Sequence, residues 1–529
     1  MATTFAHPVT QELGDIRVFN PRTGEPLYSI SEITEIEVQR YFTAARGAAT
    51  KWAKLSLRER LSYMDRLRKY ILKNKEGIID RICEETGKPR FEALLTEVFP
   101  TVDLLDLYGK TAEKILGDEA VPTPILLMGK KSKIYYEPLG TVLIIAPWNY
   151  PFNLAMTPII TALIAGNGVV FKPSEYTPLK GLLEGIFEGA GLPKDLLQVV
   201  YGAKETGRML IEGEPDKIFF TGSERAGKSI MRNAAQHLIP VELELGGKDP
   251  FIVFDDVNID RTVNGALWGA LTNSGQTCTS VERIYVQEKI YDDFVREFKA
   301  KAEKMRVPSG KAQRTDDIDM GCMTTDFQIH KVEAQIRDAK EKGAKIECGG
   351  HRNDESHVFP PTLISNIDTS MAIYYDESFG PVTTIAKFRT EEEAVRLAND
   401  SPYGLSASVW SADLARGERV ARQIVTGNVS INNVLATQGN SNLPFGGVKY
   451  SGFGRYKGPH GLYSFSNVKS ILVDKQSGKQ EVNWYPYTPE KYTLAAKMID
   501  LLYAGDKLSF IKGLLTGAKL EKLSQKEKL

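Results

Sequence analysis

A cysteine at position 278 is the residue best suited to covalent chemistry. It lies in Asn273-Ser-Gly-Gln-Thr-Cys278-Thr-Ser, just after a stretch with the apolar spacing of a helix. Its neighbours are small and polar, so a substrate carbonyl can approach the sulfur. A thiolate is a strong nucleophile, but a cysteine with an ordinary pKa of about 8.5 needs activation at neutral pH. The loop makes Cys278 a candidate nucleophile, with a buried structural cysteine as the alternative.

Two glutamates precede a pair of glycines in Glu242-Leu-Glu244-Leu-Gly-Gly-Lys248. Alternate residues of a strand point to the same side, so Glu242 and Glu244 share a face. The glycines allow a flexible turn immediately afterwards. A carboxylate beside such a turn suits general-base catalysis. The alternative is a structural carboxylate or a salt bridge at the end of the strand.

An asparagine lies between two prolines in Pro147-Trp148-Asn149-Tyr-Pro151, at the end of an apolar run. The prolines fix a turn, and the side-chain amide of Asn149 can donate two hydrogen bonds into a cleft. An oxyanion site needs donors of this kind. An asparagine that satisfies the backbone of its own loop is the alternative.

Two further segments suggest a nucleotide. In Phe171-Lys172-Pro-Ser-Glu175, an ammonium and a carboxylate follow a buried strand and can grip the two hydroxyls of a ribose. In Phe219-Phe-Thr-Gly222-Ser223, a strand runs into a helix, whose N-terminus offers backbone amides to a pyrophosphate. Neither segment is the GxGxxG fingerprint, and Gly166-Asn-Gly168 leads into a strand instead of a helix.

The elements around these motifs alternate between short apolar runs and amphipathic segments. Strands are predicted at 142–146, 169–171, 197–200, 217–220, 241–245, 251–254, 283–286, 406–410 and 427–431. Strands that alternate with helices form βαβ units and a parallel sheet. The prediction is an α/β fold with two parallel sheets. The long uncharged run from Pro138 to Phe171 is broken by prolines, which favours strand, helix and strand over a membrane span.

Composition narrows the class of protein. The 529 residues include 67 basic and 67 acidic side chains, and this balance argues against a nucleic-acid partner. The four cysteines form no CxxC pair, so neither a zinc site nor a disulfide framework is expected, and a reducing, cytoplasmic location follows. No apolar signal segment follows Met1. His351 and His357 share a polar loop that we expect to be solvated, and no metal site is predicted.

Together the motifs resemble the aldehyde dehydrogenase superfamily over roughly Val18 to Asp474. Those named above occur in the family's order and spacing. They are joined by E-S-F-G-P at Glu377–Pro381, N-D-S-P-Y-G-L at Asn399–Leu405 and P-F-G-G-V-K-Y-S-G-F-G-R at Pro444–Arg455.

The resemblance implies roles for individual residues. Cys278 matches the nucleophile, Glu244 the general base and Asn149 the oxyanion donor, joined by the backbone N–H of Cys278. The implied cofactor contacts are Trp148, Lys172, Glu175, Gly222, Ser223, Glu377 and Phe379. Of these, Lys172 and Glu175 match the residues that clamp the adenosine ribose, and Ser223 matches the residue near the pyrophosphate. Glu377 matches the residue that contacts the nicotinamide ribose, and Phe379 matches the aromatic residue beside the nicotinamide.

The implied reaction is NAD(P)-dependent oxidation of an aldehyde to a carboxylic acid, through a thiohemiacetal and a thioester on Cys278. Glu175 favours NAD, because a carboxylate repels the 2′-phosphate of NADP, although relatives with this glutamate also accept NADP. An acylating enzyme that transfers the thioester to coenzyme A is one alternative, and a non-catalytic protein on the same fold is another. Glu244 favours water as the acceptor.

The resemblance also implies an arrangement of domains. Residues 1–127 and 140–246 are assigned to a dinucleotide-binding domain, and 247–455 to a catalytic domain. Residues 128–139 and 460–475 are assigned to strands of a small oligomerisation arm, as in homodimeric or homotetrameric relatives. P-W-N-Y-P-F-N-L and the segment Trp484-Tyr-Pro-Tyr-Thr-Pro489 are similar to the fatty-aldehyde branch, whereas the flanks of Cys278 and residues 454–462 depart from it.

Residues 476–529 form a C-terminal tail of different character. Residues 491–529 contain eight lysines and four acids, and leucines recur there at helical spacing. Two helices packed on the body of the protein are one interpretation. A basic amphipathic anchor in peripheral contact with an anionic membrane is the other.

Overall fold

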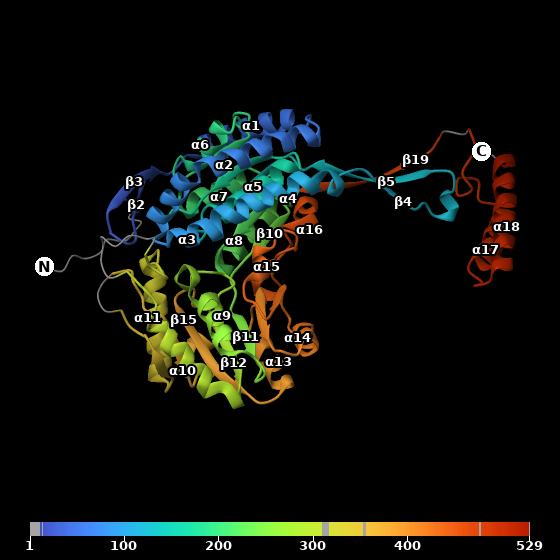
Figure 1. The fold of residues 1–529 in the computed structure, drawn as a ribbon. Coiled ribbons are helices and arrows are strands. Elements are labelled where there is room, and N and C mark those ends of the chain that lie inside the picture. The colour runs from blue at the N-terminus through green and yellow to red at the C-terminus, as the bar shows by residue number, and fades with distance from the viewer. Residues whose placement is uncertain (1–10, 13, 309–316, 353–355, 476–477, 528–529) are drawn as a thin grey trace. The chain divides into compact units, whose positions relative to one another are not determined.

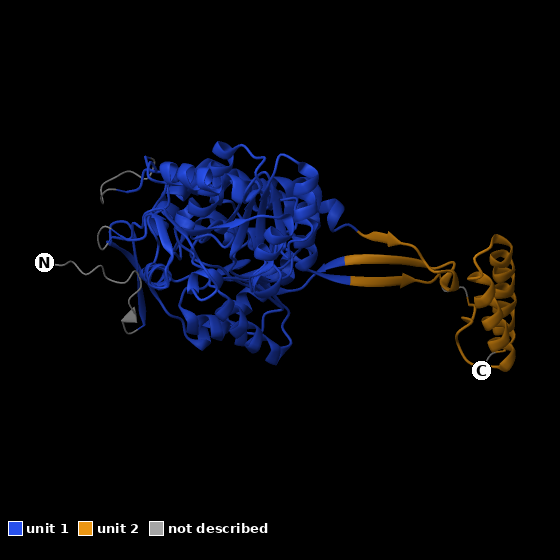
Figure 2. Cartoon of the chain, turned by 90° about the horizontal axis from the view of Figure 1, so that it is seen from below, with its two compact units in different colours: residues 1–117, 136–468 blue, residues 118–135, 469–529 orange. Residues whose placement is uncertain are grey.

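Two largely parallel sheets form the core of the larger of two units in a computed structural model, which describes residues 11–12, 14–308, 317–352, 356–475 and 478–527 (Figure 1). The chain divides into two units. Unit 1 comprises Met1–Gly117 and Tyr136–Val468, and unit 2 comprises Asp118–Tyr135 and Lys469–Leu529 (Figure 2). Both sheets lie in unit 1, and the predicted α/β class is confirmed.

The first sheet has six strands in the order β18-β10-β9-β6-β7-β8, and only β18 is antiparallel to its neighbour. The strands are β6 (Thr141–Ile145), β7 (Gly168–Lys172), β8 (Leu197–Val199), β9 (Lys217–Thr221), β10 (Val241–Glu244) and β18 (Gly452–Phe453). The helices of this region are α1 (Glu35–Trp52), α2 (Leu57–Thr86), α3 (Arg90–Glu92), η1 (Ala93–Val98), α4 (Phe99–Ile115), α5 (Asn153–Ile164), α6 (Leu182–Gly189), α7 (Lys204–Glu212) and α8 (Glu224–Ala234).

The second sheet has seven strands in the order β13-β14-β15-β12-β11-β16-β17, and only β13 is antiparallel. The strands are β11 (Asp249–Val253), β12 (Val281–Gln287), β13 (Lys345–Cys348), β14 (Thr362–Ser365), β15 (Val382–Phe388), β16 (Ser406–Trp410) and β17 (Asn428–Ile431). The main helices here are α9 (Ile259–Leu271), α10 (Tyr291–Ala302), α11 (Asp326–Glu341), α13 (Glu391–Asn399), α14 (Leu414–Ala421) and α15 (Ala436–Gly439). The predicted boundary at 247 falls between β10 and β11, and the assignment of domains stays a prediction.

Local sequence explains where these elements begin. Ser56 caps α2 and Glu59 completes a capping box, as the spacing of these two residues predicts. The uncharged run from Pro138 to Phe171 forms β6, α5 and β7, with Pro158 inside the helix. Every residue of β6 and β7 is buried, as expected for strands covered on both faces. Among the described residues, no helix is long and apolar enough to cross a membrane.

Unit 2 contains strands and a pair of helices. A three-stranded sheet has the order β19-β5-β4, formed by β4 (Glu119–Val121), β5 (Lys131–Pro138) and β19 (Ser466–Val473). Two helices follow, α17 (Pro489–Leu502) and α18 (Lys507–Lys526), and they pack against each other. Strands and helices are therefore present in the segments assigned to the arm and the tail, and the role of the arm in oligomerisation stays a prediction.

Candidate active site

The predicted site residues of the first sheet follow the carboxyl ends of four neighbouring strands. Glu244 ends β10, Gly222 and Ser223 follow β9, Trp148 and Asn149 follow β6, and Lys172 ends β7. These strands are adjacent and parallel, so their carboxyl ends share one edge of the sheet. In open α/β sheets this edge is where ligands bind.

The loop of Cys278 is a tight left-handed turn packed on another predicted motif. Asn273 and Ser274 have φ values of 52° and 55°, and Gly275 follows with 69°. A Cβ atom on Gly275 would lie 2.0 Å from the carbonyl oxygen of Gly380, so only glycine fits there. Cys278 is partly exposed, whereas Cys83, Cys322 and Cys348 are buried. Cys278 is thus the one cysteine of the four that is not fully buried.

Hydrogen bonds join the turn of Asn149 to the loop of Cys278. Asn149 Nδ2 donates to the carbonyl oxygen of Gln276 over 2.8 Å. In the opposite direction, Asn273 Nδ2 donates to the carbonyl oxygen of Asn149 over 2.9 Å. Tyr150 Oη lies 2.7 Å from Thr277 Oγ1. The predicted oxyanion donor and the predicted nucleophile therefore belong to one hydrogen-bonded assembly.

Glu244 is buried, and neither of its carboxylate oxygens has a hydrogen-bond partner among the described residues. Burial raises its pKa well above the usual value, and the neighbouring charge of Glu242 raises it further. Arg455 and Lys457 oppose this shift. A Cβ atom on Gly446 would lie 2.9 Å from Glu244 Oε1, so this glycine leaves room for the carboxylate. An unpartnered buried carboxylate of raised pKa is suited to accept a proton.

The thiol of Cys278 has a raised pKa, first because of burial and then because of Asp249, Glu377 and Glu244. Burial also raises the pKa values of all three carboxyl groups, that of Glu377 to about 7. Protonation of these groups removes part of the negative charge that disfavours a thiolate. The protonation states of Asp249, Glu377 and Glu244 therefore influence how readily Cys278 loses its proton.

A buried glutamate that the sequence did not indicate holds the E-S-F-G-P loop. Glu282 accepts hydrogen bonds from the backbone N–H groups of Ser378 and Phe379, over 2.7 and 2.9 Å. It also pairs with Lys248 Nζ at 2.7 Å. This fixes Phe379 at a φ of 54° and places its ring 5.3 Å from that of Trp148.

Glu377, on the same loop, lies against the glycines that follow Glu244. Its Oε1 accepts a hydrogen bond from the N–H of Gly247 over 3.1 Å. A Cβ atom on Gly246 would lie 2.5 Å from that oxygen. Another on Gly247 would lie 2.3 Å from the carbonyl oxygen of Cys278. The glycine pair thus lets the nucleophile loop and a predicted cofactor ligand approach the strand of Glu244.

The remaining predicted residues fit a dinucleotide. Lys172 Nζ lies 3.6 Å from the Glu175 carboxylate and donates a hydrogen bond to the carbonyl oxygen of Pro173. This pair offers one cation and one carboxylate to the hydroxyls of a ribose. Ser223 caps α8 by accepting from the N–H of Ala226, and the N–H of Gly222 donates to the carbonyl oxygen of Glu244. This helix N-terminus suits a pyrophosphate.

A buried ion pair that the sequence also did not indicate supports the turn of Asn149. Lys88 Nζ lies 2.6 Å from Glu97 Oε1 and donates to the carbonyl oxygen of Asn149 over 2.9 Å. Glu97 Oε2 accepts from the N–H groups of Phe152 and Asn153, both over 2.9 Å. Sequence gives no signal for this arrangement, because Lys88 is 61 residues from Asn149.

The expected solvated histidine loop is partly wrong. His351 is exposed, but His357 is buried, with Nε2 2.8 Å from Asp326 Oδ1 and Nδ1 3.1 Å from the carbonyl oxygen of Met323. A carboxylate and a carbonyl distant in sequence replace water around this ring. Among the described residues, no cluster of His, Cys, Asp and Glu is arranged to hold a metal ion.

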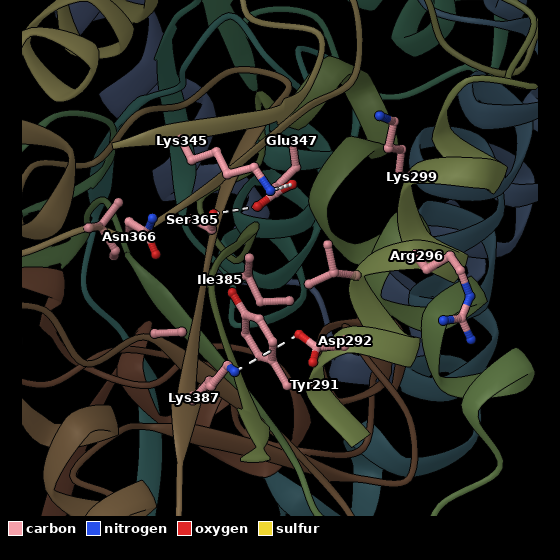
Figure 3. Close-up of a pocket in the computed structure, with 13 residues that line it drawn as sticks. Tyr291, Asp292, Arg296, Lys299, Lys345, Glu347, Ser365, Asn366, Ile385 and Lys387 are labelled. Atoms are coloured by element: carbon pink, nitrogen blue, oxygen red, sulfur yellow. Dashed lines mark hydrogen bonds and ion pairs between the residues drawn. The ribbon is translucent and has the colours of Figure 1, made fainter. Parts of the chain in front are cut away.

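A pocket of about 610 Å³ lies away from these motifs, between α10 and strands β13 to β15 (Figure 3). Charged side chains from both sides line it, including Asp292, Lys345, Glu347 and Lys387. It contains none of the predicted site residues.

Comparison with known proteins agrees with this geometry. The model of the aldehyde dehydrogenase family matches residues 9–471. A 4,4'-diapolycopene aldehyde oxidase of a Methylomonas species is 42% identical, over 89% of this chain and 88% of that protein. The mitochondrial succinate-semialdehyde dehydrogenase of rice is 36% identical, over 87% and 86%. A solved aldehyde dehydrogenase of Mycobacterium tuberculosis, complexed with NAD+, superimposes with a TM-score of 0.83 at 32% identity, over 88% of this chain and 96% of that one. The chain belongs to the aldehyde dehydrogenase family.

Proposed function

We propose that the protein oxidises an aldehyde to a carboxylic acid, with Cys278 as nucleophile, Asn149 as oxyanion donor and Glu244 as general base. The observation that carries this proposal is the hydrogen-bonded assembly of the Asn149 turn and the Cys278 loop, with the strand of an unpartnered Glu244 packed against it. The site contains a nucleophile, a donor and a base, the three groups that acyl chemistry on a thiol requires.

The first steps follow from the positions of these groups. Loss of the thiol proton to a carboxylate leaves a thiolate, which adds to the aldehyde carbon and gives a thiohemiacetal. Asn149 Nδ2 and the N–H of Cys278 hold the oxygen as negative charge develops on it. A bound NAD(P)+ supplies the acceptor for the hydride that departs from this carbon. The product on the protein is a thioester of Cys278.

Glu244 then returns the enzyme to its starting state. Its carboxylate takes a proton from water, the resulting hydroxide attacks the thioester, and the carbon–sulfur bond breaks to release the acid and the thiol. A base in this position favours water over coenzyme A as the acceptor. A screen of NAD+ reduction across short, medium, long-chain and aromatic aldehydes and semialdehydes tests the proposal. Acyl-CoA formation on addition of coenzyme A would replace it with the acylating alternative.

We further propose that the substrate is a large apolar aldehyde. The relative at 42% identity is named a 4,4'-diapolycopene aldehyde oxidase, and the segment P-W-N-Y-P-F-N-L resembles the fatty-aldehyde branch. The screen therefore separates long-chain from short-chain and charged substrates by kcat/KM.

Lys172, Glu175, Gly222 and Ser223 would hold the adenosine and pyrophosphate of the cofactor, and Trp148, Glu377 and Phe379 its nicotinamide half. Because the Glu175 carboxylate repels a 2′-phosphate, we expect kcat/KM for NAD+ to exceed that for NADP+ by about tenfold or more. Glu175→Gln should narrow this ratio mainly by improving KM for NADP+. A ratio that does not respond to the substitution would assign cofactor choice to other residues.

Lys457, together with Arg455, should lower the pH range over which Glu244 titrates. It is buried, burial lowers its pKa to about 8, and its positive charge stabilises the Glu244 carboxylate. Its charge is present below about pH 8. Lys457→Met should raise the pKa of Glu244 further, move the acidic limb of the kcat profile to higher pH and reduce activity several-fold below neutrality. Lys457→Arg keeps the positive charge and should leave the acidic limb of the kcat profile at its wild-type pH. Equal pH profiles of kcat for the wild type and both variants would contradict this role of Lys457.

We also propose a cytoplasmic homodimer or homotetramer assembled through the sheet β19-β5-β4. Strand β19 lies at the edge of that sheet and exposes Val468, Leu472 and Val473, and exposed apolar edges commonly pair with another chain.

The proposed cytoplasmic location rests on the four free cysteines, which suit a reducing compartment.

A further inference from the structure

Exposed apolar side chains are concentrated in unit 2. Half of the large apolar residues that are exposed in the described chain lie in this unit, which spans about a seventh of the protein. Most of them lie on α17, α18 and the segment that leads into α17. Single exposed apolar residues are ordinary, but a cluster marks an interaction surface.

The helical hairpin of α17 and α18 already has a complete interior. Met498 and Leu520 are buried, and a Cβ atom on Gly513 would lie 2.9 Å from Leu502, so the helices approach closely. Polar contacts close its open end. Lys491 Nζ donates to the carbonyl oxygens of Trp484 and Pro486, both over 3.0 Å. The exposed apolar residues are therefore additional to the core of the hairpin.

Those residues share one face of the hairpin. Each helical residue turns the direction of the side chain by about 100°, so positions can be placed relative to the buried ones. Tyr492, Ile499 and Tyr503 all lie about a quarter turn from the packed side of α17. Phe510 and Leu514 lie about a quarter turn from the packed side of α18, in the same sense of rotation, and Ile511 lies nearly opposite that side. A loop of four residues makes the helices antiparallel, and the same sense of rotation then places both sets on the same side.

Charge borders this face on one side. Along α18 the apolar surface continues to Leu508 and Leu515, and then meets lysines. All residues of α18 are described, and it exposes five lysines, whereas Glu521, its one carboxylate, is paired with Lys479 at 2.8 Å. The exposed lysines of this helix are Lys507, Lys512, Lys519, Lys522 and Lys526. A cationic border beside an apolar face complements a surface of apolar chains covered by anionic groups.

Aromatic side chains with polar atoms complete the surface. Trp484, Tyr485 and Tyr487 are exposed just before α17, and Tyr492 and Tyr503 are 76% and 84% exposed. Tryptophan and tyrosine favour the boundary between lipid chains and water, where the ring is buried and the polar atom stays hydrated. The matched family region ends at residue 471, so the catalytic chemistry common to the family gives no account of this surface.

We propose that the α17–α18 hairpin docks on the surface of an anionic lipid bilayer. The aromatic and aliphatic face enters the headgroup boundary, and the lysines of α18 contact lipid phosphates. The hairpin lies on the membrane, because neither helix is apolar enough to span it. This inference does not depend on the proposed reaction.

The test is flotation of the full-length protein with vesicles of phosphatidylcholine and phosphatidylglycerol. We expect the protein to float with these vesicles, to float less with phosphatidylcholine alone, and to dissociate as salt is raised. Ile499→Glu with Ile511→Glu should weaken binding by more than about tenfold, since each replaces a buried apolar contact by a charge. Both positions are exposed in the hairpin, so folding should be retained.

A matched control places the same substitutions elsewhere. Ile36→Glu with Leu414→Glu changes two equally exposed residues at the starts of α1 and α14, and should bind vesicles like the wild type. Equal flotation of all three proteins, or none, would overturn the proposal. A hairpin variant with a changed sedimentation coefficient and no loss of vesicle binding would also overturn it, and would identify the face as a contact with a second copy. Aldehyde oxidation by each variant reports separately on the proposed function.

Discussion

Replacement of Cys278 by alanine is expected to abolish aldehyde oxidation, lowering kcat by at least about four orders of magnitude. No other cysteine takes the place of Cys278, because Cys83, Cys322 and Cys348 are buried and lie outside the predicted motifs. Loss of a covalent nucleophile removes the whole pathway, so its effect exceeds that of any single hydrogen bond. Steady-state NADH formation measures the loss.

Two further measurements show that the loss concerns chemistry and not folding. Cys278→Ala should bind NAD+ with nearly unchanged affinity, because the cofactor residues lie on other elements. Cys348→Ala removes a buried thiol of β13 and should keep near-normal turnover. Substantial activity in Cys278→Ala would require another nucleophile and would reject the proposed mechanism.

Replacement of Glu244 by glutamine is expected to separate the two halves of the reaction. Glutamine has nearly the same shape but cannot take a proton from water, so formation of the thioester should continue while its hydrolysis slows by about 10² to 10⁴. Rapid mixing should therefore show one equivalent of NADH per active site, followed by a slow steady state. Mass spectrometry of the quenched protein should find the acyl group on Cys278.

Glu242→Gln is the natural comparison, since Glu242 shares the strand and the face of Glu244 but forms an ion pair with Lys217 at 2.8 Å. It should lower stability, because the buried ammonium of Lys217 loses its partner, while hydrolysis of the thioester stays fast. If Glu244→Gln showed neither a burst nor an acyl adduct, Glu244 would act before the thioester and not after it.

Sequence indicated the strands and the motifs that follow them because both are local. Predicted strands of three to five residues located β6, β7, β9 and β10 to within about one residue, and the motifs lie directly after them. The adjacency of Glu244, Gly222, Asn149 and Lys172 then follows from the shared edge of a parallel sheet. Their chemical roles stay predictions until the substitutions are made.

Residues that act through distant partners could not be found in this way. Lys88, Glu97 and Glu282 are single charged residues in unremarkable stretches, and their importance comes from backbone groups far along the chain. His357 was misjudged for the same reason, because its polar neighbours in sequence suggested water while Asp326 and Met323 surround it in the fold. Periodicity also predicted the helices of the tail, but only the fold shows which of their apolar residues remain exposed.

The left-handed turn of Asn273, Ser274 and Gly275 has a consequence for how the enzyme tolerates heat. Two of these residues carry side chains, and each is held in a conformation that costs about 1–2 kcal/mol. Glu92 Oε1, which accepts from the N–H of Asn273, and the carbonyl oxygen of Asn149 help to keep them there. Loosening of these few contacts lets the turn relax while the sheets remain intact. We therefore expect the protein to lose catalytic activity on warming at a lower temperature than that at which the fold melts.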